Sequence, residues 1–574
     1  MPLFHYLYGV KRLYAILFLS FLSAAVSHAA DLRFVVIPVE FSDVRFTDTN
    51  TYVNNKVAEA KEYLDSQFSP LYSFSFEIQP VIRLPENLSR YGRNTTDQKD
   101  SGLGEAIRQA CTLSNASFFR YDNDGDGCVD NVCLITAGYS EAEGGGSVYI
   151  WPQQGWLHDR GGTTVLSGKT IDSFTACPEF ASPAIFCHEM CHVLGLRDMY
   201  DSDGRLSGGT SRGLWGTLSI MDNGNGYSCF CAVELDQLGL GTRIPAELGH
   251  YNLKPVSRGR EYIRIDSGND GEYYLLECRA PEGWDSGIGG SGLVIYHIDR
   301  SFSDAWYSDL YRRNLSARER WDFNQVNCRP EHPCARVMEA VPNTEKIGEV
   351  FFPQDGRNAF GSETDPAFRF WDGTTSEVAI CNIRKEEDSS VSFDMIVPIT
   401  VNDIQVFQDA ALISWKVDDR INFRECNISW NNGNTLYGSR RVYPDSEGLC
   451  AVTLEGLEPQ TDYQVTIHAI SSDGPSFSRT ESFKTKVRTQ GMRPFIFLNA
   501  AERYDDGSFA RGSSIPLRIY NASDATAVTW YFNGFRIYPG SSGMWQIEKS
   551  GTLKAEVWYD DGSMEIIVKQ ISVK

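Results

Sequence analysis

The sequence predicts a mixed α/β domain followed by two all-β sandwich domains. Strand-like and helix-like segments alternate early in the chain, an order typical of a sheet covered by helices. From Pro398 onward the pattern changes to short strands separated by turns. The length of 574 residues is enough for several domains with a large core. We expect a leader over residues 1–30, the α/β domain over 31–397, and sandwiches over 398–488 and 489–574.

The segment Met1–Ala30 has the features of a secretory signal peptide. Lys11 and Arg12 give it a positive start, and Leu13–Val26 is an almost uninterrupted apolar run. This run is short for a membrane span, and no later stretch is apolar enough to cross a bilayer. We therefore expect a secreted or cell-surface protein with no membrane span once the signal peptide is removed.

The α/β domain begins with a β-branched, apolar strand at Leu32–Phe41, which we expect at the centre of the sheet. The next segment, Tyr52–Phe68, has the periodicity of a helix. We expect a strand at Tyr72–Leu84, a helix at Leu103–Leu113 and a strand at Val129–Thr136. Two edge strands are expected at Ser147–Trp151 and Gly161–Asp172. Ser182 is a good N-cap and Pro183 suits the first helical position, so another helix begins there.

An acidic loop, DNDGDGCVD at 122–130, alternates oxygen-bearing side chains with glycines. Short loops of this kind wrap a hard cation such as calcium. The loop is shorter than an EF-hand loop and lacks the final glutamate at the usual spacing. The expected ligands are Asp122, Asp124, Asp126 and Asp130, and the alternative is a solvated acidic turn without an ion.

The helix that begins at Pro183 carries the motif His-Glu-x-x-His. On a helix, His188 and His192 lie one turn apart on the same face, so two imidazoles can bind one metal ion. Glu189 can reach a water on that metal without being a ligand, as a general base does. Gly195 tolerates φ > 0, so the chain can turn and bring Asp198 round as a third, oxygen ligand. Three protein ligands leave one position open, the pattern of a catalytic zinc site.

Two alternatives to a catalytic zinc site remain open. A structural zinc site could use Cys187 and Cys191 of the same helix, although exported thiols are more often oxidised. A domain that has kept the fold and lost the activity is also compatible with the motif. The extension to Gly195 and Asp198 makes a chance match uncommon, and so does the scarcity of histidine, of which the chain has nine.

The segment GLWGTLSIMDNG at 213–224 follows the motif and places Met221 in a tight turn. A methionine in a turn below the metal is a supporting element of metzincin-type sites, where it forms an apolar floor and is not a ligand. The alternative is an ordinary core methionine.

Together these motifs resemble the immune inhibitor A family of secreted bacterial metallopeptidases. The resembling segments are VVIPVEFSD, YDNDGDGCVDNV, HEMCHVLGLRDMYD, the W-x-x-x-x-I-M-D-x-G turn, YYLLECR at Tyr273–Arg279 and GLVIYHID at Gly292–Asp299. The resemblance covers about residues 31–397. It implies a zincin-like fold, one catalytic zinc held by the two histidines and the aspartate of the motif, and peptide-bond hydrolysis with Glu189 as base. Arg197 stands where the family commonly has a proline before its third ligand.

The C-terminal segments predict two sandwiches. In the first, Leu457-x-Pro-x-Thr-x-Tyr463 resembles a fibronectin type III domain, with Tyr463 as the corner tyrosine and Trp415 in the core. In the second, short strands with turns at Asn533–Gly534 and Asp561–Gly562 indicate an immunoglobulin-like domain. We expect these domains to act as spacers or to bind a surface, a glycan or the substrate.

The amino-acid composition argues against some classes of binding partner. The formal net charge is −22, and loss of Lys11 and Arg12 with the leader takes it to −24. Such acidity argues against nucleic acid and anionic membranes as partners, and it suits cation binding. All fourteen cysteines follow the leader, and in an exported chain we expect most of them in disulfide bonds. Cys328 and Cys334 could close a small local loop.

The sequence thus predicts a secreted zinc metalloendopeptidase, a hydrolase that cleaves peptide bonds of extracellular proteins. A zinc-activated water would attack the peptide bond, with Glu189 as the general base. The expected cofactors are Zn²⁺ and Ca²⁺, and the expected partners are protein or peptide substrates, including host extracellular or surface proteins. The competing hypothesis is a surface adhesin or glycan-binding protein whose zincin domain is vestigial.

Overall fold

The computed structural model describes residues 29–574, except 97, 205, 207–210, 224–225, 304, 434–435, 473, 488–493, 499–503, 505–507 and 541. The expected signal peptide therefore lies almost wholly outside the described residues. The chain divides into two compact units, the first comprising residues up to 247, 251–357 and 383–392, and the second comprising 248–250, 358–382 and 393–574. No described helix is both long enough and apolar enough to span a membrane.

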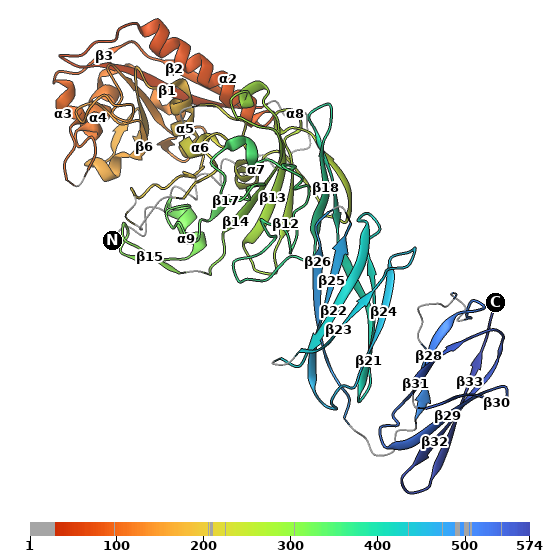
Figure 1. Ribbon diagram of the computed structural model, residues 1–574. Coiled ribbons are helices and arrows are strands. Elements are labelled where there is room, and N and C mark those ends of the chain that lie inside the picture. Colours follow the sequence, from red (N-terminus) through yellow and green to blue (C-terminus); the bar gives the residue numbers. More distant parts are fainter. Residues whose placement is uncertain are drawn as a thin grey trace. The chain divides into compact units, whose positions relative to one another are not determined.

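The first unit is built on a mixed sheet with the strand order β2-β1-β5-β9-β6 (Figure 1). β1 (Ala30–Glu40) pairs in parallel with β2 (Tyr72–Ile78) and β5 (Val132–Thr136), so it lies inside the sheet, where the sequence predicts it. β9 (Ser173–Pro178) extends the parallel order. β6 (Gln153–Trp156) is antiparallel to β9 and forms one edge of the sheet.

The alternation of side chains along β1 separates two cores. Phe34 joins a hydrophobic cluster with α2 (Lys56–Phe68) and α5 (Pro183–Val193). Its neighbour Val35 joins a second cluster with α4 (Leu103–Leu113). The central sheet therefore has helices on both faces, and α5 lies on the face shared with α2.

The two predicted edge strands are not where the sequence analysis expected them. Residues 147–151 form no strand, and the edge strand β6 begins at Gln153. The segment 161–172 forms a hairpin of β7 (Thr164–Leu166) and β8 (Lys169–Ile171) in a separate sheet with β4 (Cys128–Val129). Residue pattern indicates which side chains a strand buries, but the partner of a short strand is decided by long-range packing.

The first unit contains a second sheet in the order β10-β12-β13-β14-β17, antiparallel from β12 onward. Its longest strands, β13 (Glu272–Arg279) and β14 (Gly292–Asp299), are buried along their whole length. Further strands of the chain up to residue 396 are β3 (Ile82–Arg83), β10 (Thr242–Ile244), β11 (Gly249–Leu253), β12 (Glu261–Asp266), β15 (Trp306–Ser308), β16 (Arg313–Leu315), β17 (Ala335–Val337), β18 (Ala379–Lys385) and β19 (Val391–Ile396). The shorter helices are η1 (Asn50–Asn55), α3 (Leu88–Gly92), η2 (Phe118–Tyr121), η3 (Leu157–Arg160), α6 (Ile220–Asn223), α7 (Ala232–Leu238), α8 (Val256–Gly259), η4 (Gly283–Asp285), α9 (Ala317–Asp322) and η5 (Ile347–Glu349).

The second unit is mostly β-structure. Its first two sheets, β20-β21-β24 and β23-β22-β25-β26, share one hydrophobic cluster around the fully buried Trp415. The hydroxyl of Tyr463 accepts a hydrogen bond from the backbone N–H of Glu458 (2.9 Å), as a corner tyrosine does. Ala359 and Ile396 belong to the same cluster, so residues expected in the α/β domain pack here. The strands are β20 (Ile399–Val406), β21 (Ala410–Val417), β22 (Phe423–Asn431), β23 (Leu436–Val442), β24 (Leu449–Glu455), β25 (Asp462–Ser471) and β26 (Phe477–Lys484).

The last two sheets of this unit, β27-β28-β31 and β30-β29-β32-β33, share a cluster around Trp530. Asn533 and Gly534 have φ values of 50° and 85°, as the predicted two-residue hairpin turn requires. The strands are β27 (Phe495–Ile496), β28 (Ser514–Tyr520), β29 (Ala525–Phe532), β30 (Phe535–Pro539), β31 (Ser542–Gln546), β32 (Gly551–Tyr559) and β33 (Met564–Ile571).

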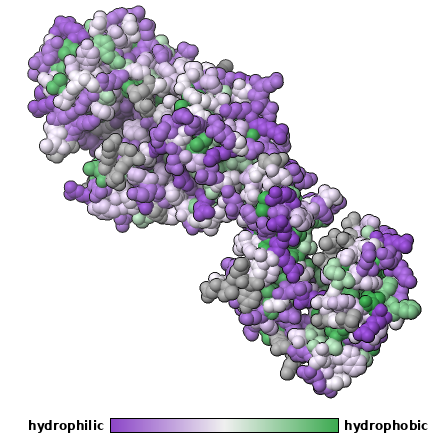
Figure 2. Space-filling model, viewed as in Figure 1, coloured by the Kyte–Doolittle hydropathy of each residue, from purple (hydrophilic) through white to green (hydrophobic). Residues whose placement is uncertain are grey.

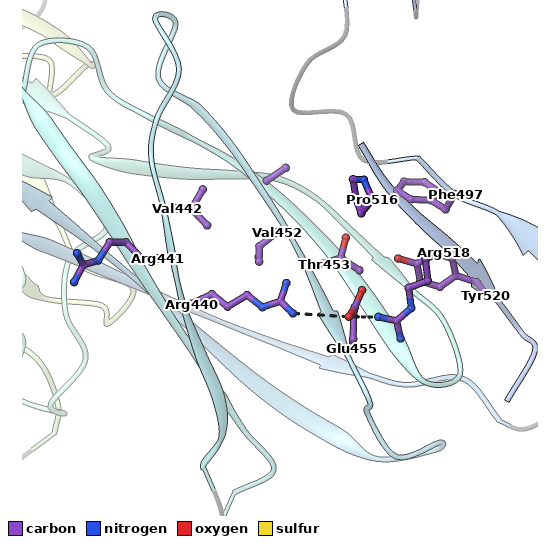
Figure 3. A pocket seen from close by; sticks show the side chains of 11 residues that line it. Arg440, Arg441, Val442, Val452, Thr453, Glu455, Phe497, Pro516, Arg518 and Tyr520 are labelled. Atoms are coloured by element: carbon purple, nitrogen blue, oxygen red, sulfur yellow. Dashed lines mark ion pairs between the residues drawn. The ribbon is translucent and has the colours of Figure 1, made fainter. Parts of the chain in front are cut away.

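The face of the molecule in Figure 2 is mostly hydrophilic, and some hydrophobic residues are exposed on it. A pocket in the second unit contains Glu455, which forms ion pairs with Arg440 (3.8 Å) and Arg518 (Figure 3). Its described lining includes no histidine or cysteine, so it offers no imidazole or thiolate ligand for a metal ion.

The fourteen cysteines are all thiols in the structure, so the expected disulfide bonds are not found. Cys328 contacts the hydroxyl of Ser202 (3.4 Å), whereas Cys334 donates to the carbonyl of Ala317 (3.6 Å). The predicted local loop between these two cysteines is therefore not closed. An even number of cysteines does not say which pairs the fold brings together.

Candidate metal centre

Helix α5 begins and ends as its sequence dictates. The side chain of Ser182 accepts a hydrogen bond from the N–H of Ala184 (3.2 Å), and Pro183 occupies the first turn. At the other end Gly195 has φ 102°, and the N–H of Leu196 bonds back to the carbonyl of Cys191 (3.0 Å). This left-handed residue reverses the chain direction directly after the motif, as the sequence predicts.

The reversal brings the three expected ligands together. Oδ1 of Asp198 lies 3.2 Å from Nε2 of His188 and 3.2 Å from Nε2 of His192. The three donor atoms all lie within 4.8 Å of one another, and all three side chains are at least largely buried. Oδ1 of Asp198 is buried and faces the two histidines, but neither contact has the geometry of a hydrogen bond.

Backbone carbonyls orient both imidazoles. Nδ1 of His188 lies 2.8 Å from the carbonyl of Ile220, and Nδ1 of His192 lies 3.0 Å from the carbonyl of Leu196. An imidazole that donates from Nδ1 to a carbonyl carries its lone pair on Nε2, the atom that here faces Asp198. A hydrogen bond at the other ring nitrogen fixes the orientation of a histidine that binds a metal ion.

The charges of the cluster favour a cation at its centre. Burial lowers the pKa of His188, but Asp198 and Glu189 outweigh it and raise this pKa to about 9. Burial raises the pKa of Asp198, but the two histidines lower it well below its usual value. Two imidazole nitrogens and one carboxylate oxygen are the donors that Zn²⁺ takes in catalytic sites, so the residues fit this ion.

Glu189 lies beside this cluster on the side of the edge strand. Burial raises its pKa, while His188 and His192 oppose the shift. The backbone N–H of Gln154, in β6, is a hydrogen-bond partner of its carboxylate. The potential base therefore lies next to β6, which among the described strands pairs with β9 alone.

Met221 is fully buried in α6, in the turn that supplies the Ile220 carbonyl. Its own carbonyl accepts the N–H of Met199 (2.9 Å), which ties the ligand loop to the turn. Asp222 accepts the N–H groups of Leu214 (2.9 Å) and Gly216. The turn therefore lies next to His188, whose ring contacts the Ile220 carbonyl, and the role of Met221 as an apolar floor stays a prediction.

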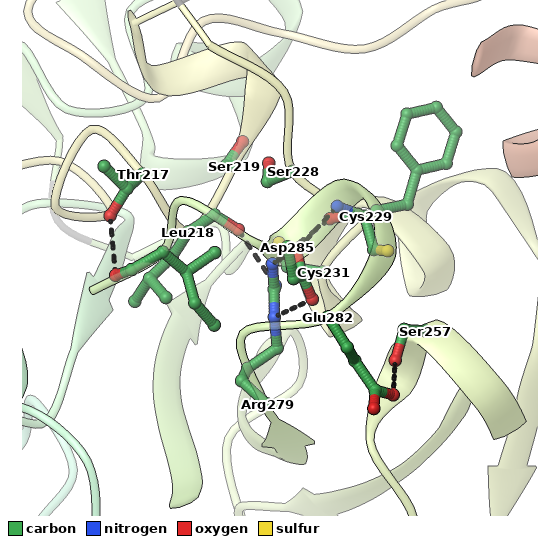
Figure 4. Close-up of polar contacts among 12 residues, drawn as sticks. Thr217, Leu218, Ser219, Ser228, Cys229, Cys231, Ser257, Arg279, Glu282 and Asp285 are labelled. Atoms are coloured by element: carbon green, nitrogen blue, oxygen red, sulfur yellow. Dashed lines mark hydrogen bonds and ion pairs between the residues drawn. The ribbon is translucent and has the colours of Figure 1, made fainter. Parts of the chain in front are cut away.

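A buried arginine supports the same turn from β13 (Figure 4). Arg279 donates to the carbonyls of Leu218 (3.0 Å) and Cys229 (3.4 Å). It also pairs with Asp285 (2.6 Å) and Glu277 (3.1 Å), and all three side chains are fully buried. A buried charge is tolerated only when it is paired and hydrogen-bonded, so this network fixes the geometry of the segment that precedes Met221.

The acidic loop is assembled only in part. Asp122, Asp124 and Asp126 have carboxylate oxygens within 4.8 Å of one another, and Oδ1 of Asp122 is buried without a hydrogen-bond partner. Asp130 is not part of this group, because its Oδ2 accepts the backbone N–H (2.6 Å) and side-chain N–H (2.8 Å) of Asn123. Lys169 contacts Oδ2 of Asp122 (2.5 Å) and supplies a positive charge that the sequence analysis did not anticipate.

Three further residues of the site were missed from the sequence. The ring of Tyr200 stacks on His188 with 6.3 Å between centroids, and burial together with Asp198 and Glu189 raises its pKa. Asn324 bonds to Asp198, and Arg279 holds the methionine turn. No pattern in a single sequence indicates that Tyr200 and Asn324 belong to the site. Arg279 could have been found, because an arginine at the end of the apolar run YYLLECR indicates a buried charge that needs partners.

Zincin-type metal-dependent hydrolases use the same pattern of residues, namely two histidines on one helix, an oxygen-bearing side chain after a glycine turn and an adjacent glutamate. Residues 37–228 match the model for the immune inhibitor A peptidase M6 catalytic domain. This part of the chain is therefore similar to that metallopeptidase family, and the resemblance seen in the sequence is confirmed.

Two curated relatives are similar to this chain. They are the pre-pro-metalloprotease PrtV of two Vibrio cholerae serotype O1 strains, M66-2 and ATCC 39315 / El Tor Inaba N16961. Each is 27% identical over 215 residues, which cover 32% of this chain and 23% of the relative. The chain thus spans about a quarter of the length of the curated relatives it matches.

Two solved structures are similar to small parts of the chain. One comes from a computer-based redesign of a β-sandwich protein, with 19% identity, a TM-score of 0.13 and coverage of 15% of this chain and 95% of that chain. Another is described as a myokine structure, with 23% identity, a TM-score of 0.14 and coverage of 16% and 98%. With TM-scores this low, neither structure supports an inference about fold or function.

Proposed function

We propose that this protein is a secreted zinc-dependent endopeptidase. The observation that carries the proposal is the convergence of Nε2 of His188, Nε2 of His192 and Oδ1 of Asp198 on one buried point, with Glu189 beside it. A zinc ion bound there supplies Lewis acidity and lowers the pKa of a coordinated water to about 7. The leader at residues 1–30 supports export.

The residues of the chain have separate tasks in this reaction. His188, His192 and Asp198 hold the metal, with the histidine orientations set by the carbonyls of Ile220 and Leu196. Glu189 takes the proton of the attacking water and passes it to the leaving amine. Burial raises the pKa of Glu189, and a carboxylate with a raised pKa is a stronger base.

The edge strand β6 supports a protein or peptide substrate. Its Gln154 is a backbone hydrogen-bond partner of Glu189, and only one side of β6 pairs within the sheet, to β9. An extended peptide can add to such an edge by main-chain hydrogen bonds. A substrate bound in this way runs past Glu189, so cleavage inside a chain is favoured.

Zinc analysis combined with proteolysis tests the proposal. We expect about one zinc per purified chain by elemental analysis, together with cleavage of an unfolded protein such as reduced casein that a zinc chelator abolishes. A folded protein without zinc and without proteolysis would favour the competing adhesin or glycan-binding function. Mass-spectrometric mapping of cleaved peptides would then define side-chain preference.

We further propose a calcium site at Asp122, Asp124 and Asp126. The buried Oδ1 of Asp122, which accepts no hydrogen bond, supports it, whereas the Lys169 contact offers another source of positive charge. Asp130 accepts two hydrogen bonds from Asn123, so Asp130 is not one of the proposed calcium ligands.

Removal of calcium is expected to lower the melting temperature while zinc stays bound. The stabilisation is about 2.7 kcal/mol at a hundredfold excess of calcium over its dissociation constant. Asp126→Ala should remove this calcium dependence, whereas Asp270→Ala, at an exposed turn of the same unit, should keep it. Calorimetry with and without a calcium chelator measures the effect. Identical melting curves for wild type and Asp126→Ala under both conditions would mean that Lys169 alone neutralises the loop.

For the C-terminal region we propose a fibronectin type III-like domain over 398–488 and an immunoglobulin-like domain over 489–574. The buried Trp415 and the Tyr463 hydroxyl bond support the first, and the Asn533–Gly534 hairpin supports the second. We propose that they bind a surface, a glycan or the substrate, or act as spacers.

A further inference from the structure

The loop that carries the third ligand is held by a segment far along the chain. Nε of Arg197 donates to the carbonyl of Trp321 (3.0 Å), and the side chain of Asn327 donates to the carbonyl of Met199 (2.6 Å). Ser202 donates to the carbonyl of Asn324. The paired residues are 122–128 positions apart, and the distant partners lie in or just after α9, outside the part of the chain that matches the peptidase model.

Asn324 makes two reciprocal bonds to the ligand itself. Its Oδ1 accepts the backbone N–H of Asp198 (2.8 Å), and its Nδ2 donates to Oδ2 of Asp198 (2.6 Å). One amide thus fixes both the backbone and the carboxylate of the same residue. Because Oδ2 is occupied, the oxygen left facing His188 and His192 is Oδ1.

The residue type suits this position for two reasons. A carboxamide offers a donor and an acceptor side by side without adding charge next to a carboxylate. The backbone of Asn324 has φ 55°, a left-handed conformation that asparagine and glycine adopt at little cost. A different side chain would lose one bond, add a charge or strain the backbone.

We propose that Asn324 is a positioning residue for the metal centre, which orients Asp198 so that Oδ1 faces the two histidines. This inference rests on the proposed zinc site and adds to it a residue that touches neither metal nor substrate. Mutation of a residue that hydrogen-bonds to a metal ligand typically lowers metal affinity or activity 10–100-fold. Part of the metal centre would then come from outside the matched catalytic segment.

Metal affinity of the full chain tests the proposal through two variants. Asn324→Gly keeps the left-handed backbone and removes both bonds, and we expect zinc to bind 10–100-fold more weakly in competition with a chelating dye. Asn324→Asp keeps size and acceptor but sets a second carboxylate against Oδ2, so it should weaken binding at least as much. Asn343→Gly is the matched control, an exposed asparagine at φ 58° in the same unit, and should bind zinc normally.

Cobalt(II) in place of zinc gives a readout that a loss of stability would not change. We expect the visible absorption of the cobalt protein to differ from wild type in both Asn324 variants, because the ligand oxygen is no longer fixed, and to be unchanged in Asn343→Gly. Wild-type zinc affinity and an unaltered cobalt spectrum in folded Asn324→Asp would overturn the proposal while leaving the zinc site intact. Failure of the wild-type chain to bind zinc would overturn the proposed function itself.

Discussion

Glu189→Gln should leave the protein with about one zinc per chain and nearly without proteolytic activity. Glutamine has the size of glutamate and removes no member of the cluster of His188, His192 and Asp198, so metal binding should persist. It has no carboxylate to accept a proton, and a positioned general base contributes typically ~10²–10⁴-fold to the rate. Elemental analysis and cleavage of a fluorogenic peptide measure the two quantities on one preparation.

The same exchange at an exposed site serves as the control for Glu189→Gln. Glu62→Gln, on the solvent side of α2, should keep both zinc and activity. Zinc loss in Glu189→Gln would mean that this residue helps hold the metal. Substantial cleavage by pure Glu189→Gln protein would contradict its assignment as the base.

His192→Ala should lose both zinc and activity, and Asp198→Ala should behave in the same way. Each change removes one of the three converging donor atoms and leaves a pair that binds zinc weakly. We expect the loss of activity to be at least as large as in Glu189→Gln, with the difference that zinc content falls with it. The ratio of zinc to protein therefore separates ligands from base.

A histidine outside the cluster provides the comparison for the ligand variants. His250→Ala removes an imidazole that is 66% exposed and should change neither zinc content nor cleavage. Full zinc and full activity in Asp198→Ala would show that Asp198 is not the third ligand. Asp201 would then be the next oxygen to test, since it lies in the same loop beside Asp203 and Cys328.

The features that could be predicted from the sequence are local in the chain. Leu103–Leu113 was expected as a helix with the bounds it has in the structure, and Ser182, Pro183 and Gly195 determine where α5 begins and turns. Helix periodicity and capping depend on residues within a few positions of one another, so one sequence contains them. The spacing of the two histidines brings their rings together for the same reason.

The surroundings of these local features depend on segments that meet only in the folded chain. Asn324 reaches Asp198 across 126 residues, and Arg279 reaches Leu218 across 61. Likewise, Asn123 binds Asp130 and Lys169 contacts Asp122, which changes the expected calcium site. These contacts follow from how sheets and loops pack, and no periodicity or short spacing in a single sequence encodes them. The motif thus indicates the proposed metal ligands, whereas the packing of distant segments determines how each of these side chains is oriented and which charges surround it.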